Sequence, residues 1–206
     1  DYTALSFDRS AERSMWSGYD AICGVSEFVS QGFRRTFPEL AGKVQTIENI
    51  LPKELILEQT EAPQNDMPSE ESISLLSIGR FCDAKNFDNI PDLCRRLVED
   101  GLDVRWYLIG YGGDEPRIRQ KIAEAGMENR VIILGKKDNP YPYLRACDLY
   151  VQPSRYEGKA VTVREAQLLG KPVVITNYAT SASQLEDGVD GVIVPMDNEG
   201  CAAGIA

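Results

Sequence analysis

The sequence predicts an α/β protein built around a doubly wound, parallel β-sheet with a Rossmann-like arrangement. From residue 73 onwards, short apolar runs alternate with segments whose apolar residues recur at helical spacing. Glycine or proline separates most of these segments, as in the short connections of βαβ units. Right-handed crossovers would place helices on both faces of such a sheet.

Six strands are expected in this part of the chain, each a short apolar run. They cover residues 73–79, 104–110, 131–135, 148–153, 172–176 and 191–195. Helices are expected between them, at residues 87–97, 116–125, 141–145 and 162–169, with a helical turn at 183–186 and a last helix from 197. Pro116 in a first turn and Gly126 just past a last turn are typical helix boundaries.

The beginning of the chain has a different organisation. Residues 20–25 and 44–47 are expected to be strands around a helix at 26–36. One βαβ unit buries too little surface to form a domain by itself, so residues 1–53 are expected to be the remnant of an amino-terminal domain. Residues 54–71 are polar and acidic and contain two prolines, which predicts a linker. Residues 72–206 would form the second domain, truncated at its carboxyl end.

The composition argues against several classes of function. The 206 residues include 22 basic and 32 acidic side chains, a net charge of −10 that argues against a nucleic-acid partner. The absence of histidine excludes His-based catalytic triads and His metal ligands. The five cysteines have no Cys-x-x-Cys spacing, which favours reduced thiols. The apolar runs are far shorter than the ~18 residues that span a bilayer.

The first candidate site follows the first expected strand of the sheet. In doubly wound sheets, ligands bind beyond the carboxyl ends of the strands, where the strand order reverses. Gly79, Arg80 and Lys85 occupy this position. Arginine offers a planar fork of donors and lysine a point charge, a combination suited to a diphosphate. The alternative is a solvated loop with two ordinary cations.

The second candidate site follows the fourth expected strand and opens a helix. Gly158 permits close approach of a ligand to the backbone, and the amides of residues 158–161 lie at a helix N-terminus, which favours phosphate. Glu157 and Glu165 flank these amides and can each bind hydroxyl pairs of a sugar ring. The alternative is that both carboxylates only stabilise the helix end by charge.

A third stretch, Gly110 to Gly113, follows the second expected strand. A dinucleotide fingerprint needs a third glycine where this chain has Glu115, so an ordinary turn is the favoured interpretation.

Together, the two candidate loops resemble the donor-binding half of a retaining GT-B glycosyltransferase, close to glycosyltransferase family 4. Glu157 and Glu165 match its pair of glutamates separated by seven residues. The Gly79 to Lys85 loop matches its Gly-Arg…Lys loop, and residues 147–154, 170–176 and 188–194 match three further motifs in order. Residues 21–26 and 44–49 look like the end of the amino-terminal acceptor domain.

The resemblance implies a role for each candidate residue. Arg80 and Lys85 would neutralise the donor diphosphate, Glu165 would bind the ribose and Glu157 the transferred sugar, which makes Arg80, Lys85 and Glu157 the catalytic set. Other donor contacts would come from Gly79, Lys136, Gly158, Lys159, Ala160 and Val161, with Lys136 in the base pocket. The chain departs from the family where Lys159 and Ala160 replace Phe-Gly, and where Gln184 replaces a common glutamate.

The implied reaction transfers a sugar from a nucleoside-diphosphate sugar, with retention of configuration and with neither metal nor cofactor. The acceptor, a cell-surface polysaccharide or glycolipid precursor, would be bound mainly by the amino-terminal domain. The expected location is the cytoplasm, with peripheral contact to the membrane through that domain. A sugar-nucleotide epimerase of the same architecture and a non-catalytic nucleotide-sugar binding module are the alternatives.

Overall fold

A computed structural model of the chain describes residues 9–64, 66–67 and 72–206. Contacts divide the chain into two units, Asp1–Ile50 and Leu51–Ala206, and each is described by itself.

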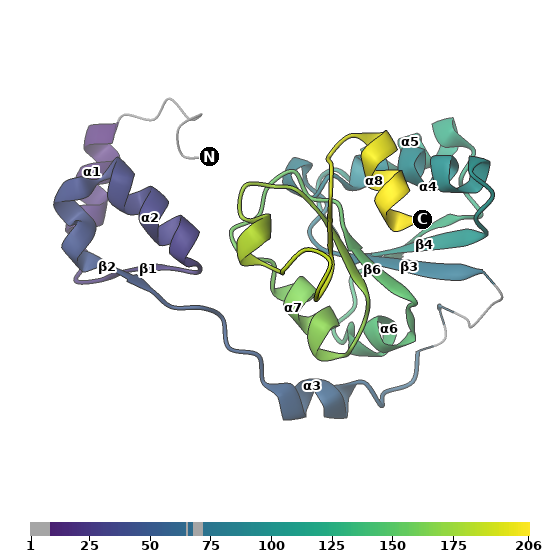
Figure 1. The fold of residues 1–206 in the computed structure, drawn as a ribbon, viewed down its shortest axis with the longest axis horizontal. Coiled ribbons are helices and arrows are strands. Elements are labelled where there is room, and N and C mark those ends of the chain that lie inside the picture. Colours follow the sequence, from purple (N-terminus) through teal and green to yellow (C-terminus); the bar gives the residue numbers. More distant parts are fainter. Residues whose placement is uncertain (1–8, 65, 68–71) are drawn as a thin grey trace. The chain divides into compact units, whose positions relative to one another are not determined.

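The carboxyl-terminal unit contains a six-stranded sheet in which every described pairing is parallel (Figure 1). Its strands are β3 (Ile73–Ile78), β4 (Val104–Ile109), β5 (Val131–Gly135), β6 (Leu149–Gln152), β7 (Val173–Thr176) and β8 (Val192–Val194). The order across the sheet is β5-β4-β3-β6-β7-β8. This confirms the doubly wound sheet and puts the reversal of strand order between β3 and β6.

Helices cover both faces of this sheet (Figure 1). On one face lie α4 (Ile90–Glu99), α5 (Glu115–Ala125) and α8 (Asn198–Ile205), and on the other lie α6 (Tyr141–Ala146) and α7 (Val161–Leu168). Alternation along β4 supplies both cores: Trp106 belongs to the first buried cluster and Tyr107 to the second. Strands covered on both faces explain the continuous apolar runs in the sequence.

The amino-terminal unit has a small core of its own. The expected strands and helix are present as β1 (Ile22–Gly24), α2 (Glu27–Thr36) and β2 (Val44–Thr46), and β1 pairs with β2 in parallel. Ser26 begins α2 by accepting a hydrogen bond from the Val29 amide through its side chain. A helix that the sequence analysis did not identify, α1 (Arg9–Ser17), precedes them.

The segment expected to be a linker is partly helical. Helix α3 (Lys53–Gln59) packs against α6 and belongs to the carboxyl-terminal unit. The side chain of Ile56 is fully buried, and Asn139 donates a hydrogen bond to the Gln59 carbonyl at 2.8 Å. A single buried isoleucine in a polar, acidic stretch explains why composition alone indicated a linker. Part of the expected linker, residues 65 and 68–71, lies outside the described residues.

Two smaller differences concern helix boundaries. The expected helix at 87–97 begins as a 3₁₀ turn, Phe87–Asn89, before α4. The expected turn at 183–186 is a 3₁₀ turn over Ser181–Ser183.

The Gly110 to Gly113 stretch braces the loop that follows β3. The Phe81 amide donates to the Tyr111 carbonyl at 2.8 Å, and the Asp114 amide donates to the Phe81 carbonyl at 3.2 Å. A Cβ atom at Gly110 would overlap the carbonyl oxygen of Gly79. The glycine therefore permits two backbones to approach closely.

We expect Gly110→Ala to lower the melting temperature and to displace the loop that carries Arg80, because backbone atoms rather than a flexible side chain obstruct the new methyl group. Gly113→Ala is the matched control, since a Cβ there meets no heavy atom within 4 Å. Thermal unfolding of both variants makes the comparison. Equal melting temperatures would contradict the bracing role of Gly110.

Candidate functional site

The loops that follow β3 and β6 meet at the reversal of strand order. The Arg155 amide donates to the Ala84 carbonyl at 2.9 Å, and the Asn86 side chain donates to the Pro153 carbonyl at 3.0 Å. The Tyr156 hydroxyl donates to Asp83 at 2.8 Å. The two loops singled out in the sequence therefore form one continuous surface.

An ion pair between Lys85 and Glu157 joins the two loops. The Lys85 Nζ lies 2.5 Å from Glu157 Oε1, and the two side chains are 20% and 9% exposed. A Cβ at Gly79 would lie 3.2 Å from Lys85 Cε, so the absence of a side chain at Gly79 leaves room for the lysine to cross the loop. Asn86, in a left-handed conformation, ends the 3₁₀ turn Asp83–Lys85 that carries the lysine.

Glu157 is also held by two neighbours from its own segment. Ser154 Oγ donates to Glu157 Oε1 at 2.6 Å, and Gln152 Nε2 donates to the same oxygen at 3.2 Å. Its backbone carbonyl accepts from Thr180 at 2.7 Å. Hydrogen bonds from two side chains to the same oxygen hold the carboxylate group in one orientation.

Glu165 lies inside α7 and contacts the preceding helix. The Tyr141 hydroxyl, at the start of α6, donates to Glu165 Oε1 at 2.9 Å. Burial raises the pKa of Glu165, and the hydrogen bond from Tyr141 only partly offsets it. Burial and the neighbouring carboxylate raise the pKa of Tyr141 to about 12. Glu165 is thus a partly buried carboxylate held by one neutral donor.

Gln184 organises the N-terminus of α7. Its Oε1 accepts from the Ala160 amide at 2.7 Å, and its Nε2 donates to the Ala160 carbonyl at 3.2 Å. One of the amides expected to face a phosphate is therefore hydrogen-bonded within the protein. The glutamine, noted in the sequence as a departure from the family, holds the segment that connects Glu157 to α7.

The cations predicted for ligand binding differ in their surroundings. Arg80 is exposed in the β3–α4 loop, one residue beyond Gly79. Lys136 is exposed in the loop after β5 and pairs with Asp138 at 3.3 Å. Neighbouring Lys137 pairs with Asp66, and its ammonium lies 5.4 Å from the centre of the Tyr143 ring. No ion pair among the described residues links Lys136 to the Lys85–Glu157 pair.

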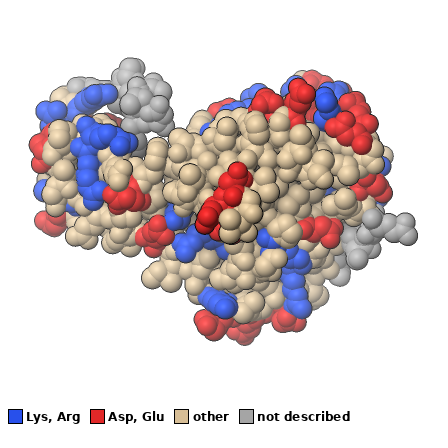
Figure 2. Space-filling model, viewed as in Figure 1, with Lys and Arg blue, Asp and Glu red and all other residues tan. Residues whose placement is uncertain are grey.

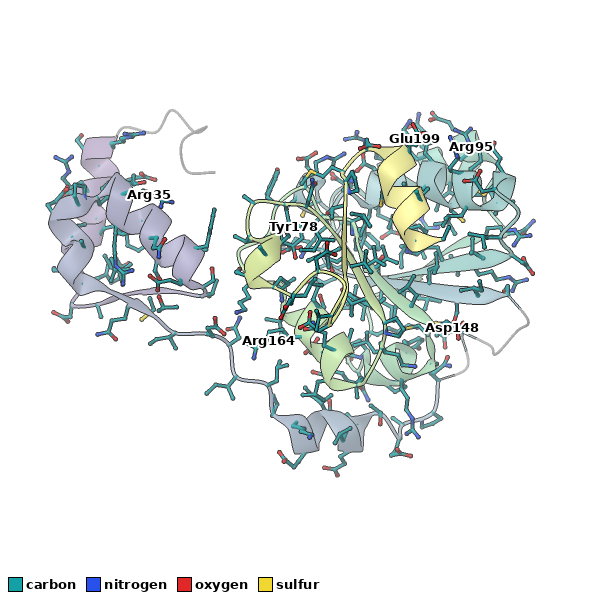
Figure 3. The ribbon with its side chains drawn as sticks, viewed as in Figure 1. Arg35, Arg95, Asp148, Arg164, Tyr178 and Glu199 are labelled. Carbon is teal, nitrogen blue, oxygen red and sulfur yellow. The ribbon has the colours of Figure 1, made fainter. Side chains whose placement is uncertain are left out.

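Tyr178 follows β7 and lies in the interior at the carboxyl ends of the strands, whereas Asp148 precedes β6 at the opposite end (Figure 3). Burial raises the pKa of Tyr178, and the negative charge of Glu157 raises it further. Among the described residues, its buried hydroxyl has no hydrogen-bond partner.

Figure 2 shows how the charged side chains of the described residues are distributed in one view. Lysine and arginine side chains are interspersed with aspartate and glutamate (Figure 2). Within residues 9–64, 66–67 and 72–206, no group of three or more Cys, Asp or Glu side chains is placed to hold a metal ion. In the same part of the chain, every helix is too short or too polar to cross a bilayer.

The sequence analysis missed the side chains that support the two glutamates, namely Gln152, Ser154 and Tyr141. Gln152 had a visible signal, because it is a polar residue at the end of an apolar strand, next to the proline that ends the run. Ser154 lies in the stretch 147–154 that matches a family motif, but the match assigned it no contact. Tyr141 had no signal, because its contact depends on how two helices pack.

The raised pKa of Glu165 predicts a pH-dependent effect of Glu165→Gln. A folded-state pKa above the unfolded value gives a contribution to stability that is present at low pH and lost as the pH rises through the folded pKa. The variant lacks this loss, so its melting temperature should rise relative to wild type as the pH increases above the ordinary glutamate pKa of about 4.3.

Glu124→Gln is the matched control with the opposite sign, because hydrogen bonds from Gln120 and Lys121 lower the pKa of Glu124. This variant should melt below wild type above the ordinary glutamate pKa of about 4.3, and the difference should shrink as the pH falls below that value. Thermal unfolding at several pH values tests both. A pH-independent difference for Glu165→Gln would contradict the assigned cost of burial.

Relatives of this chain include enzymes of polysaccharide assembly. It is 29% identical over 141 residues to the lipopolysaccharide core biosynthesis glycosyltransferase LpsE of Rhizobium meliloti, covering 68% of this chain and 40% of LpsE. It is 28% identical over 144 residues to the amylovoran biosynthesis glycosyltransferase AmsK of Erwinia amylovora, covering 66% of this chain and 35% of AmsK. The matched region thus spans less than half of either relative.

Several solved structures share the fold. Staphylococcus aureus TarM, in a complex that contains UDP, superposes with a TM-score of 0.79 at 21% identity, covering 100% of this chain and 40% of TarM. Anabaena HepE, in complex with UDP and glucose, gives a TM-score of 0.78 at 20% identity, covering 96% of this chain and 56% of HepE. At these identities the likeness establishes the architecture, that of GT-B enzymes.

The family assignment rests on most of the chain. The sequence model of the family described as glycosyl transferases group 1 matches residues 58–206. This range contains the whole parallel sheet, both loops at the reversal of strand order and every candidate site residue. The chain belongs to the glycosyl transferases group 1 family.

Proposed function

We propose that residues 72–206 bind the donor of a retaining, metal-independent glycosyltransferase that uses a nucleoside-diphosphate sugar. The observation that carries this proposal is the Lys85–Glu157 ion pair, which joins the two candidate loops at the reversal of strand order. A cation for a diphosphate and a carboxylate for sugar hydroxyls then lie side by side. The UDP complexes of the structural neighbours TarM and HepE support this choice of ligand.

The donor diphosphate is assigned to Arg80 and Lys85. As the bond between the anomeric carbon and the diphosphate oxygen breaks, negative charge grows on the leaving group, and positioned cations stabilise it. Lys85 is partly buried, so its charge is less screened than that of exposed Arg80. The N-terminus of α7 lies next to the backbone amides of Gly158, Lys159 and Val161. These amides would donate further hydrogen bonds to the diphosphate.

The two glutamates are assigned to two different sugars. Glu157 lies in the loop beside Lys85 and would bind hydroxyls of the transferred sugar, whereas Glu165 lies one to two turns into α7 and would bind the ribose. Lys136, in the loop after β5, would border the base.

In the proposed reaction, an acceptor hydroxyl attacks the anomeric carbon on the face that the diphosphate leaves. The new C–O bond forms as the old one breaks, and the acceptor proton passes to the departing phosphate, so no histidine is needed. The acceptor would be a polysaccharide or glycolipid precursor, in line with the relatives LpsE and AmsK. The amino-terminal unit would contribute to its binding, and the cytoplasmic location stays a prediction.

Arg80→Ala and Lys85→Ala should each weaken UDP binding by ~10- to 100-fold and leave uridine binding nearly unchanged, because each removes a charge-assisted contact worth ~1.5–3 kcal/mol. Arg95→Ala on α4 is the control for loss of one positive charge, since Arg95 pairs with Asp92 away from both loops. Calorimetric titration of the intact protein compares the ligands. Equal effects on UDP and uridine would contradict the diphosphate assignment.

Glu165→Ala should weaken UDP and UDP-glucose to the same extent, because both ligands contain the ribose. Glu157→Ala should leave UDP affinity nearly unchanged and lower both kcat and kcat/KM, because its hydrogen bonds strengthen as the sugar flattens towards the transition state. Nucleotide affinity and initial rates in the intact protein separate the two roles. Intact UDP affinity in Glu165→Ala, or an unchanged kcat in Glu157→Ala, would refute the assignment.

Turnover of the intact protein should survive treatment with EDTA, since the proposed mechanism stabilises the leaving diphosphate with Arg80 and Lys85 rather than with a metal ion. Initial rates before and after chelation make the measurement. Complete loss of turnover that Mg²⁺ or Mn²⁺ restores would overturn metal independence.

A further inference from the structure

The two oxygens of the Glu157 carboxylate have very different surroundings. Lys85, Ser154 and Gln152 all donate to Oε1, at 2.5, 2.6 and 3.2 Å. No described residue donates a hydrogen bond to Oε2. Donors of the protein therefore occupy Oε1, whereas Oε2 can accept a hydrogen bond from a ligand. The side chain as a whole is only 9% exposed.

Gln152 is the part of this arrangement that reaches into the core. Its side chain is fully buried at the end of β6, and its Nε2 donates to both Ser154 Oγ, at 2.7 Å, and Glu157 Oε1. Its Oε1 lies 2.5 Å from the Tyr150 hydroxyl, which lies 2.8 Å from Thr162 Oγ1. Every donor and acceptor of the amide is thus used within the protein.

The Tyr150 hydroxyl fixes which way the Gln152 amide faces. Complete burial raises the pKa of Tyr150 strongly, so its hydroxyl keeps its proton and donates it to the amide oxygen. A flipped amide would place its oxygen against the Glu157 carboxylate and its NH₂ against a hydroxyl already engaged with Thr162. The NH₂ group of Gln152 therefore points at Glu157. Because this donor is already fixed in place, the Glu157 carboxylate loses little conformational entropy when it aligns with it.

We propose that Gln152 is a positioning residue for the donor sugar: with Ser154 it fixes Oε1 of Glu157, so that Oε2 accepts a hydrogen bond from a hydroxyl of that sugar. The inference rests on the proposed function. Lys85 is also assigned to the diphosphate, so its ion pair with Glu157 can break when the nucleotide sugar binds. The two neutral donors are held by the core and remain on Oε1 when the lysine leaves.

The decisive measurement is the ratio of the affinities for UDP-glucose and UDP, together with kcat/KM, in the intact protein. Gln152→Met keeps the length of the side chain and removes the donor. It should lower the affinity ratio and kcat/KM by about 10-fold or more, while UDP affinity changes less than about 2-fold. Ser154→Ala, a smaller change, should shift the same two quantities in the same direction.

Ser77→Ala is the matched control. Ser77 is also fully buried, donates to the Val151 carbonyl at 2.6 Å and accepts from Trp106, but it makes no contact with Glu157 among the described residues. This variant should lower the melting temperature and leave the affinity ratio unchanged. A fall of the ratio in Ser77→Ala as large as in Gln152→Met would overturn the proposal.

A double-mutant cycle completes the test. If Gln152 acts through Glu157, Gln152→Met should cause less than about a 2-fold further loss of kcat/KM in a Glu157→Ala background. Independent, multiplicative losses would overturn the positioning role, as would a parallel loss of UDP affinity in Gln152→Met. Failure of the wild-type protein to bind UDP-glucose, UDP-N-acetylglucosamine, GDP-mannose or ADP-glucose is a different result, which would overturn the proposed function and this inference with it.

Discussion

The contact between Lys85 and Glu157 across the reversal of strand order is the interaction on which the site depends. Parallel strands end at the same edge of a sheet, but only at the reversal do the following loops diverge and leave a crevice. In this chain β3 and β6 lie side by side there, and their loops meet through a short ion pair of partly buried groups. A cation and a carboxylate are thereby brought together from positions 72 residues apart.

Several polar side chains are buried around this ion pair, and most of them form hydrogen bonds within the protein. The chain from Thr162 through Tyr150 and Gln152 to Glu157 is hydrogen-bonded throughout. A half-satisfied network of this kind would destabilise the core more than apolar packing would. Glu165 is held less completely, by one tyrosine, and burial raises its pKa. Carboxylates whose pKa is raised by burial are common in binding sites, where some stability is given up for function.

From residue 73 onwards, the order of strands and helices along the chain and the position of the two loops that carry the candidate site could be predicted from the sequence, because apolar periodicity and glycine positions report burial and turns directly. The helix α3 could not, since one buried isoleucine in an acidic stretch leaves no periodic pattern. The pairing of Lys85 with Glu157 needed the strand order, which no local pattern encodes. The role of Gln184 could not be predicted from a local pattern either. Its side chain makes two hydrogen bonds to the backbone of Ala160 and so supports the start of α7, at a position where the sequence departs from the family.

The most direct test of the central claim is a crystal structure of the intact protein with a nucleoside-diphosphate sugar bound. The account predicts the diphosphate within hydrogen-bonding distance of Arg80 and Lys85, the ribose on Glu165, and a sugar hydroxyl on Oε2 of Glu157 while Gln152 and Ser154 remain on Oε1. A diphosphate bound elsewhere, with the Lys85–Glu157 pair intact, would contradict it.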